Sequence, residues 1–485
     1  MFLHSLINHS AQLFDIIWKS NSPSDAIASE YLRKKKYIGS NDRKFISATV
    51  FATLRAKLTS DLCIDNLKIQ RTYEINEQNI NILRITSILF ISLRFPEKRK
   101  LIEIDSLMHH FQKILDDNNY SLLIETLSEL LNISQYHGKS ILDSFENTML
   151  FLSSCHLNLT GNDKNSISLD DVHSLEALIS MPTNLINKLS KNRSINYTIQ
   201  VAEAMLFPAK VCLRVANTTF NVENTRLQLN SESIFSKPGN ISPVCIILEK
   251  RSKITSHSLY TNGILEVQDE GSQIISYCLA PERNACVLDA CAGSGGKTLH
   301  IASLQNDKGR IIASDVDLKK LHELNKRASR FGYKSIKTVL MKTFSNGKQE
   351  VPADFIEGFD YVLVDAPCSG SGTFRRNPKQ KYTLTNSLLA KICENQIRIL
   401  SYYSKFVKPG GIIVYATCSL FADENELIIE IFLRENPDFL PSPLAPILSK
   451  YKIKIAGLRA DDFYLTLNPA IHETDGFFIC RMQKS

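Results

Sequence analysis

Two cysteines stand at positions where covalent chemistry is possible. Cys368 lies in 360–378, DYVLVDAPCSGSGTFRRNP, shortly after an apolar run that ends in Asp365. Cys418 lies in 414–426, VYATCSLFADENE, after a second apolar run. Each run predicts a buried strand, and the carboxyl ends of parallel strands meet at one edge of a sheet. A lone buried cysteine usually acts as a small hydrophobic residue, but two at one sheet edge, each followed by Ser, favour reactive thiols.

A glycine-rich stretch at 287–302, VLDACAGSGGKTLHIA, predicts a binding site for a nucleotide-like ligand. It is typical of a buried strand, a tight turn and the start of a helix, whose N-terminal amides face the ligand. The predicted binding residues of the turn are Cys291, Ala292, Gly293, Ser294, Gly295, Gly296 and Lys297. A phosphate-binding P-loop is disfavoured, because Cys291 stands where that motif requires Gly. A purely structural turn is the alternative for this stretch taken alone.

Two carboxylates complete the predicted site. Asp315 ends the next apolar run, GRIIASDV at 309–316. An acidic residue at the end of the second strand is placed to bond a ribose hydroxyl pair. The alternative is that Asp315 caps a helix that starts near Leu318. Asp365 is placed to hydrogen-bond either a substrate amino group or the bound donor.

Together these residue types suit methyl transfer to carbon 5 of cytosine. That carbon is a poor nucleophile, and addition of a thiolate to carbon 6 makes it an enamine-like nucleophile that can take a methyl group from a sulfonium donor. A base then removes the carbon-5 proton and the thiol is eliminated, so one difficult step becomes several easier ones. The target base must leave its stack to enter such a pocket. Amino nitrogens already carry a lone pair, so methylation there needs no thiol.

The elements that must position these residues follow from Gln268 onward, where strands and helices alternate. This alternation predicts an α/β, Rossmann-like doubly wound sheet over residues 261–485. The predicted strands lie near Cys286–Leu288, Arg310–Ser314, Ile336–Met341, Tyr361–Val364, Gly411–Tyr415 and Phe477–Arg481.

The chain before this sheet predicts two further parts and a linker. Residues 1–150 show apolar residues at helical spacing and predict an all-α bundle. Residues 151–180 are polar and predict a linker around TGNDKNSIS, and residues 181–260 predict a small α+β segment. The expected helices are 26–36, 43–58, 80–93, 101–115 and 122–131, and the expected short strands are 211–216, 227–229 and 241–248.

Basic residues in both of these parts suggest contacts with RNA phosphates. Solvated helix ends and chance scatter explain the same residues, so both explanations stay open. The residues are Arg33–Lys36, Arg43, Lys44, Lys210, Arg214, Lys250, Arg251 and Lys253.

Composition limits the remaining possibilities. The 485 residues carry a net charge of +7, a mild indication of a polyanionic partner. No run approaches the roughly 20 apolar residues of a membrane span, and the N-terminus lacks the pattern of a targeting peptide. The eleven cysteines show no CxxC pair and no zinc spacing. We therefore expect a cytoplasmic protein with reduced thiols, no metal and no membrane contact, and we expect a monomer.

The motifs resemble those of the Sun/RsmB type of RNA cytosine-5 methyltransferases, which use S-adenosylmethionine. The resemblance rests on Gln268-Asp269, CAGSGGKT (291–298), SDVD (314–317), DAPCSGSG (365–372), RRNP (375–378), TCS (417–419) and DGFF (475–478). It implies that Cys418 is the nucleophile and that Cys368 assists product release. It further implies that 291–297, Asp315 and Asp365 bind the cofactor.

The same resemblance extends to the front of the chain. YIGSNDRKFISATVFATLR (37–55) is similar to the signature of a NusB-like RNA-binding domain, so residues 1–150 are expected to be NusB-like. The middle segment would then match the family's small RNA-binding extension. The implied substrate is ribosomal RNA of the small subunit.

Two departures from the family pattern and three alternatives stay open. Gly293-Ser294 replaces the family's usual Ala-Pro, and LMKTFSNG (340–347) lacks the acid that the family carries near the adenine. The alternatives are a transfer RNA methyltransferase, a catalytically weak RNA-binding assembly factor, and a cysteine hydrolase that would use His472.

Overall fold

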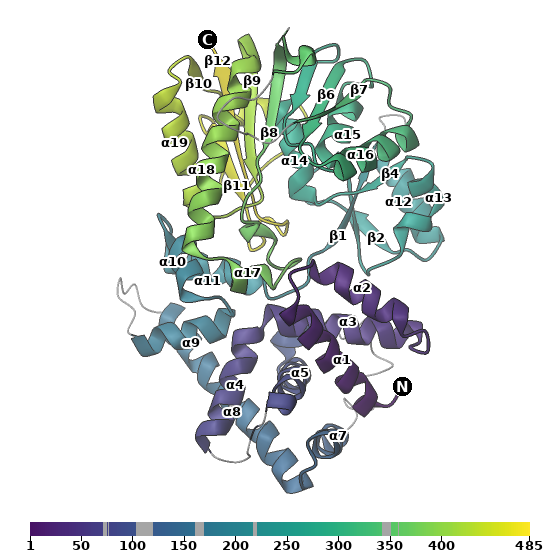
Figure 1. The fold of residues 1–485 in the computed structure, drawn as a ribbon, viewed down its shortest axis with the longest axis vertical. Coiled ribbons are helices and arrows are strands. Elements are labelled where there is room, and N and C mark those ends of the chain that lie inside the picture. The colour runs from purple at the N-terminus through teal and green to yellow at the C-terminus, as the bar shows by residue number, and fades with distance from the viewer. Residues whose placement is uncertain are drawn as a thin grey trace. The chain divides into compact units, whose positions relative to one another are not determined.

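The computed structural model describes residues 1–70, 75, 77–102, 120–160, 169–216, 221–341, 351–356 and 358–485. These residues form two units (Figure 1). The first contains Met1–Ala209 together with Phe374–Leu384, and the second contains Lys210–Thr373 and Thr385–Ser485. The helical front part and the α/β part therefore follow one another as predicted, with one short segment of the later sequence belonging to the first unit.

The second unit is built on an eight-stranded, largely parallel sheet. Its order is β10-β12-β9-β8-β5-β6-β7, with β11 paired to β12. The strands are β5 (Cys286–Asp289), β6 (Arg310–Asp315), β7 (Ile336–Leu340), β8 (Phe359–Asp365), β9 (Val407–Thr417), β10 (Phe439–Pro441), β11 (Tyr464–Leu467) and β12 (Phe477–Lys484). Strands β5 to β9 pair in parallel and β12 joins β9 antiparallel. The six strands predicted for this part are confirmed, while β10 and β11 carried no signal that we recognised.

Helices cover both faces of this sheet because its central strands are apolar on both sides. Along β8, Val362 and Val364 belong to a core shared with helices α18 (Asn386–Tyr403) and α19 (Glu426–Glu435). Leu363 belongs to the opposite core. That core includes residues of α14 (Glu270–Leu279), α15 (Gly296–Leu304) and α20 (Ala445–Ser449). Helix α16 (Leu318–Phe331) follows β6.

A smaller antiparallel sheet, in the order β2-β3-β1-β4, precedes the large one within the same unit. It contains β1 (Val211–Val215), β2 (Ser236–Pro238), β3 (Cys245–Leu248) and β4 (Leu265–Val267), with helices α12 (Val222–Ser231) and α13 (Ser258–Thr261). The predicted strand at 227–229 is wrong, because Asn221 caps a helix there by accepting a 2.8 Å bond from the Glu223 amide. The suggested RNA contact of Arg214 is also wrong, since its side chain is fully buried.

The described residues of the first unit form helices and the loops that connect them. Its helices are α1 (Leu3–Lys19), α2 (Ser24–Lys34), α3 (Ser40–Arg55), α4 (Lys57–Gln70), α5 (Glu77–Arg94), η1 (Pro96–Leu101), α7 (Ser121–Leu131), α8 (Gln135–Thr160), α9 (Leu169–Ile179), α10 (Thr183–Ser190), α11 (Ile195–Ala204) and α17 (Gln380–Thr383). The predicted bundle is confirmed, although most of the helix expected at 101–115 lies outside the described residues.

The predicted linker at 151–180 is wrong in its described parts. Helix α8 continues to Thr160 and α9 begins at Leu169. Leu152, Leu175 and Ile179 are buried on these helices, so tertiary packing outweighs the polar composition that suggested a linker. The predicted boundary at residue 260 falls inside the second unit, and helices α10 and α11 belong to the first.

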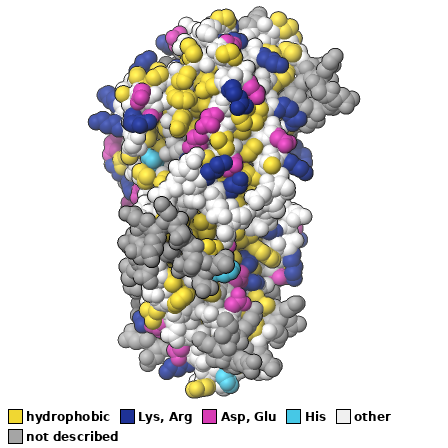
Figure 2. Space-filling view, turned by 90° about the vertical axis from the view of Figure 1, so that its left-hand side faces the viewer, with side chains coloured by type: hydrophobic (Ala, Val, Ile, Leu, Met, Phe, Trp, Pro, Cys, Tyr) yellow, Lys and Arg dark blue, Asp and Glu magenta, His cyan; other side chains and the backbone are white. Residues whose placement is uncertain are grey.

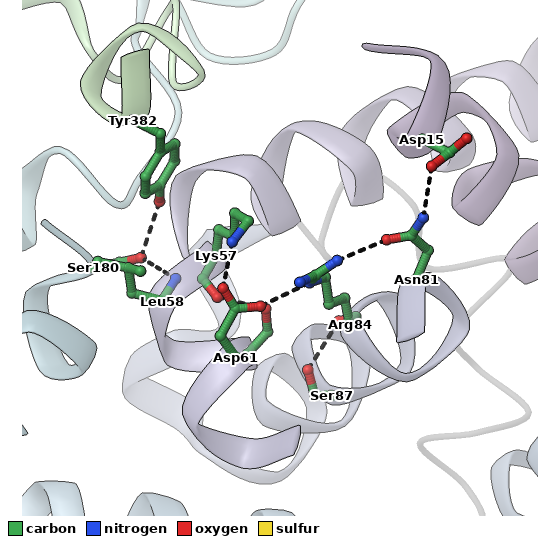
Figure 3. A network of polar contacts seen from close by, with 10 residues as sticks. Asp15, Lys57, Leu58, Asp61, Asn81, Arg84, Ser87, Ser180 and Tyr382 are labelled. Carbon is green, nitrogen blue, oxygen red and sulfur yellow. Dashed lines mark hydrogen bonds and ion pairs between the residues drawn. The ribbon is translucent and has the colours of Figure 1, made fainter. Parts of the chain in front are cut away.

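Segment 374–384 is held inside the first unit by polar contacts (Figure 3). The Tyr382 hydroxyl lies 3.2 Å from Ser180 Oγ, which also accepts a 2.9 Å bond from the Leu58 amide. Beyond them, Asp61 accepts a 2.7 Å bond from Arg84 Nε. Lys381, almost fully buried, donates a 2.5 Å bond to the Arg55 carbonyl.

Charge is distributed without a large block of one sign on the face shown in Figure 2, where Lys and Arg side chains alternate with Asp and Glu. Within the described ranges, no helix combines the length and the apolar character that crossing a membrane requires.

Candidate functional site

The residues predicted to carry chemistry follow four neighbouring parallel strands. Asp289, Asp315 and Asp365 are the last residues of β5, β6 and β8, and Thr417 is the last residue of β9. These strands are adjacent in the sheet order β9-β8-β5-β6. Their carboxyl ends therefore form one edge, the place where open α/β sheets bind ligands.

The two cysteines meet at this edge. Cys368 Sγ lies 3.2 Å from Cys418 Sγ, and both residues are partly exposed. The Gly372 amide donates a 2.9 Å bond to the Cys418 carbonyl, which ties the two loops together. The shared contact with Cys418, followed by burial, raises the pKa of the Cys368 thiol well above its ordinary value. Two thiols this close together can act on the same bound substrate.

The glycine turn has the backbone shape that its sequence predicted. Gly293 has φ 54° and Gly295 has φ 87°, both in the left-handed region that favours glycine. A side-chain carbon added to Gly293 would meet no heavy atom within 4 Å, so the turn borders open space. The side chains of Cys291 and Ala292 pack against apolar cores. The Ala292 amide donates a 3.0 Å bond to the Ser314 carbonyl, and its carbonyl accepts a 2.9 Å bond from the Gly295 amide, which fixes the start of the turn.

Asp315 connects the second strand to this turn. Its Oδ2 accepts a 2.8 Å bond from the Gly293 amide, and its Oδ1 accepts a 2.9 Å bond from the Asp317 amide. Helix α16 is capped by Asp317, whose side chain accepts from the Lys319 and Lys320 amides. The alternative role of Asp315 as the helix cap is therefore excluded.

An ion pair joins Lys297, which follows the glycine turn, to Asp365 at the end of β8. Lys297 Nζ lies 2.6 Å from Asp365 Oδ2, with the two side chains 14% and 28% exposed. Burial alone would lower the pKa of Lys297, but Asp365, with smaller contributions from Asp289 and Cys418, raises it above its ordinary value. Lys297 therefore stays protonated and places a positive charge among the carboxylates and thiols of this edge.

Asp289 was not among the predicted site residues. It is buried, its Oδ2 accepts a 2.6 Å bond from the Thr298 hydroxyl, and its Oδ1 has no partner. Burial raises the pKa of Asp289 to about 7. Its place at the end of a strand, two residues before Cys291, is the signal that could have identified it. An unsatisfied buried carboxyl oxygen beside the turn is suited to a ligand that carries hydrogen-bond donors.

Arg327 on helix α16 binds the carbonyl of Ser294 in the turn, and the sequence did not predict this contact. Arg327 Nη1 donates a 2.5 Å bond to this carbonyl. Arg327 also pairs with the buried carboxylate of Glu266 in β4, 3.1 Å away. The turn therefore keeps its shape with Ser at a position where the resembled family usually has Pro. The acid-free stretch at 340–347 lies largely outside the described residues.

His472 does not contact either thiol. Its Nδ1 accepts a 3.1 Å bond from the Asn468 amide, and its Nε2 faces the Ala456 carbonyl at 3.4 Å. Both ring nitrogens are thus occupied by backbone groups, which removes the basis for a cysteine hydrolase. Across the described part of the chain, no group of three or more His, Cys, Asp or Glu side chains is arranged to hold a metal ion.

The arrangement can support covalent catalysis on a flat ring placed against the thiols. A thiol can add to the ring, the second thiol stands within reach of the same atoms, and the adjacent turn with its carboxylates can hold a donor molecule. The fit of the turn to such a donor rests on its open side, on the partnerless oxygen of Asp289 and on the carboxylates of Asp315 and Asp365.

Known proteins share both the sequence and the fold of this part. Residues 276–483 match the family of 16S rRNA methyltransferases RsmB/F. The probable ribosomal RNA small subunit methyltransferase B of Bacillus subtilis (strain 168) is 28% identical over 459 residues, which cover 93% of this chain and 92% of that protein.

Two solved structures from Pyrococcus horikoshii extend the comparison. A methyltransferase homologue is 27% identical with a TM-score of 0.54, over 66% of this chain and all of that chain. NSun6, solved with SFG, is 18% identical with a TM-score of 0.54, over 63% of this chain and 99% of that chain. The likeness to NSun6 concerns the fold alone.

Proposed function

We propose, from the match of residues 276–483 to the family of 16S rRNA methyltransferases RsmB/F, that the chain methylates carbon 5 of a cytosine in small-subunit ribosomal RNA, with S-adenosylmethionine as methyl donor. The observation that carries the proposal is the 3.2 Å approach of Cys368 and Cys418 at the edge that also holds the glycine turn. Methylation of an amino nitrogen or a hydroxyl needs no such pair of thiols.

In the proposed reaction Cys418 attacks carbon 6 of the flipped cytosine, and the electron pair moves to carbon 5. The bound donor supplies an electrophilic methyl group, which carbon 5 takes up. The bond between the methyl group and the donor's sulfonium sulfur breaks in this step, so the donor leaves as a neutral thioether. A base then takes the carbon-5 proton, and the electron pair of that bond expels the Cys418 thiolate from carbon 6 and restores the aromatic ring. Cys368, beside the same sulfur, assists this release.

The residues proposed to hold the donor are those around the turn. The backbone of 291–297 forms its cradle, Asp315 faces the ribose, and Asp289 and Asp365 offer carboxyl oxygens to its polar groups. Lys297 holds Asp365 in place and keeps this cluster of acids from being uniformly negative. A sulfonium and an ammonium group both suit such acceptors.

We propose RNA binding for the two remaining parts of the chain. The helical unit is proposed to be a NusB-like RNA-binding domain, and the small sheet β2-β3-β1-β4 is proposed to extend the RNA contact. The support is the net charge of +7, the motif at 37–55 and the name of the Bacillus subtilis relative.

The mechanism is tested with cysteine variants and a transcript of small-subunit rRNA. Cys418→Ala is expected to lower methyl transfer from tritiated S-adenosylmethionine by at least about 10³-fold, because the covalent step is lost. Cys368→Ala is expected to accumulate a protein–RNA adduct visible on a denaturing gel. Cys286→Ala, which removes a thiol at the opposite end of β5, is the matched control and should retain activity. Full activity of Cys418→Ala would rule out the mechanism.

The substrate and the donor are tested separately. Transfer RNA transcripts offered beside the rRNA transcript distinguish the two RNA classes, and calorimetry with S-adenosylmethionine tests the turn directly. Absence of binding at millimolar donor would favour an RNA-binding assembly factor that keeps the fold without the reaction.

A further inference from the structure

A single buried carboxylate joins the loops of the two cysteines. Glu424, in the 3-10 turn η7 (Ala422–Glu424), has no exposed surface. Its Oε1 accepts a 2.7 Å bond from the Ser369 amide, and its Oε2 accepts 2.5 Å bonds from the hydroxyls of Ser369 and Ser419. Ser369 directly follows Cys368 and Ser419 directly follows Cys418, so the two serines noted in the sequence share one acceptor.

Neighbouring amides hold the other side of each cysteine. Gln396 Nε2 donates 3.1 Å bonds both to Glu424 Oε1 and to the carbonyl of Pro367, the residue before Cys368. Asn425 Oδ1 accepts a 2.6 Å bond from the hydroxyl of Thr417, the residue before Cys418. Asn425 Nδ2 donates a 3.0 Å bond to the Ser419 carbonyl. Both residues that flank each thiol are thereby fixed to one cluster.

The chemistry of Glu424 suits it for this task. An ionised carboxylate accepts about four hydrogen bonds, and Glu424 accepts one each from the Ser369 amide, the Ser369 hydroxyl, the Ser419 hydroxyl and the Gln396 amide. Hydrogen bonds to a charged acceptor are roughly twice as strong as those between neutral groups. Removal of the charge would loosen both loops at once, because both hydroxyls share Oε2.

A buried polar cluster often contributes to stability alone. Its location decides whether the Glu424 cluster only stabilises the fold or also positions the two thiols. These bonds end on the residues adjacent to the two thiols, whose sulfurs lie 3.2 Å apart. In the proposed reaction the same two sulfurs act in turn on one base, and a displacement of about 1 Å at a reacting atom can cost on the order of 100-fold in rate.

We propose that Glu424 is a positioning residue that holds Cys368 and Cys418 in place for the two steps of the covalent reaction. Its hydrogen bond to Ser419 positions Cys418 for attack on carbon 6. Its hydrogen bonds to Ser369 position Cys368 for release of the product. This inference rests on the proposed function.

The roles of the Ser419 and Ser369 hydrogen bonds are tested by measuring attack and release separately. The probe for attack is a small-subunit rRNA transcript made with 5-fluorocytidine, whose methylated adduct cannot lose the carbon-5 substituent. Ser419→Ala is expected to slow adduct formation on this probe about 10- to 100-fold. Ser369→Ala is expected to form that adduct at the wild-type rate but to accumulate adduct on an ordinary transcript. Glu424→Gln is expected to show both defects while its affinity for S-adenosylmethionine stays unchanged.

The control for a lost buried carboxylate is Glu270→Gln. Glu270 is equally buried and accepts bonds of 2.6 and 2.8 Å from the Ile241 and Ser242 amides. This variant is expected to lose stability without changing either step. If Ser369→Ala and Ser419→Ala slow attack and release equally, or if neither changes a step, the positioning role is overturned. The cysteine variants distinguish failure of this positioning role from failure of the proposed function. Only retained activity of Cys418→Ala would contradict the proposed function.

Discussion

The place of Asp289 in the fold raises the pKa of its carboxyl group. Its carboxyl group is buried at the end of β5, and desolvation raises its pKa from an ordinary value of 3.8 to about 7. Between these two values the folded chain keeps a proton that the unfolded chain has released. The contribution of Asp289 to stability is therefore fully present below about pH 4 and is lost as the pH rises through about 7.

Asp289→Asn should remove this pH dependence. The amide keeps an acceptor for Thr298 and never ionises, so the variant should lose less unfolding free energy than the wild type between pH 4 and pH 8. The raised pKa corresponds to a difference of at most about 4 kcal/mol. Denaturant unfolding at several pH values measures the free energy of unfolding of both proteins. An equal dependence of this free energy on pH in the two proteins would contradict the raised pKa of Asp289.

At this scale the sequence identifies residues whose neighbours in the chain already indicate their place. Cys368 and Cys418 were predicted because each follows an apolar strand, and Asp315 because it ends one. Glu424 could not be recognised in the same way, since its hydrogen bonds reach Ser369, 55 positions earlier. Arg327 and Ser294 meet across 33 positions for the same reason, and no local pattern encodes such a pair.

Two backbone segments touch beside the cysteine loops. The turn η5 (Ser371–Thr373) follows Cys368, and Gly476 immediately precedes β12. The Gly476 amide donates a 2.8 Å bond to the Gly372 carbonyl. A side-chain carbon on Gly372 would lie 2.2 Å from the Gly476 carbonyl oxygen, a contact with rigid backbone. Both positions therefore require glycine for close approach rather than for an unusual φ.

Gly372→Ala should destabilise the second unit by about 1–3 kcal/mol, because one backbone segment must move away from the other. Gly296→Ala is the control, since its added carbon meets its nearest neighbour at an ordinary 3.8 Å. Thermal unfolding compares the two variants. A Gly372→Ala protein as stable as Gly296→Ala would show that these segments separate without cost.

Elements were predictable where periodicity is strong and boundaries are marked. The central strands β5, β6, β8 and β9 contain apolar runs next to Gly or Asp, and all four were found. The strand expected at 227–229 is helical because the cap at Asn221 lies outside the three residues that suggested a strand. The linker expected at 151–180 is largely helical because its buried leucines pack against partners distant in sequence.

The chain passes between its two units three times, after residues 209, 373 and 384. Segment 374–384 directly follows the cysteine loop in sequence yet packs within the helical unit. Its residues Phe374, Lys381 and Leu384 are no more than 6% exposed. No sequence pattern indicated this, because RRNP reads as a continuation of the preceding motif.

A fragment that begins at Lys210 should therefore carry an exposed segment. Without the helical unit, Phe374, Lys381 and Leu384 lose their cover, so trypsin should cleave after Lys379 and Lys381 much faster than in the intact chain. Mass spectrometry of timed digests of both proteins measures the difference. Equal resistance at these two lysines would mean that the segment has cover independent of residues 1–209.

This placement also orders events during synthesis. The ribosome releases residue 209 long before residue 384, and at roughly 5–20 residues per second the interval is on the order of 10 to 35 s. During this interval the helices of the first unit lack Lys381 and Tyr382, which pack among them in the folded protein. Maturation of the amino-terminal half is thus timed by translation of the carboxyl-terminal half, and a premature stop before codon 374 would leave both halves incomplete.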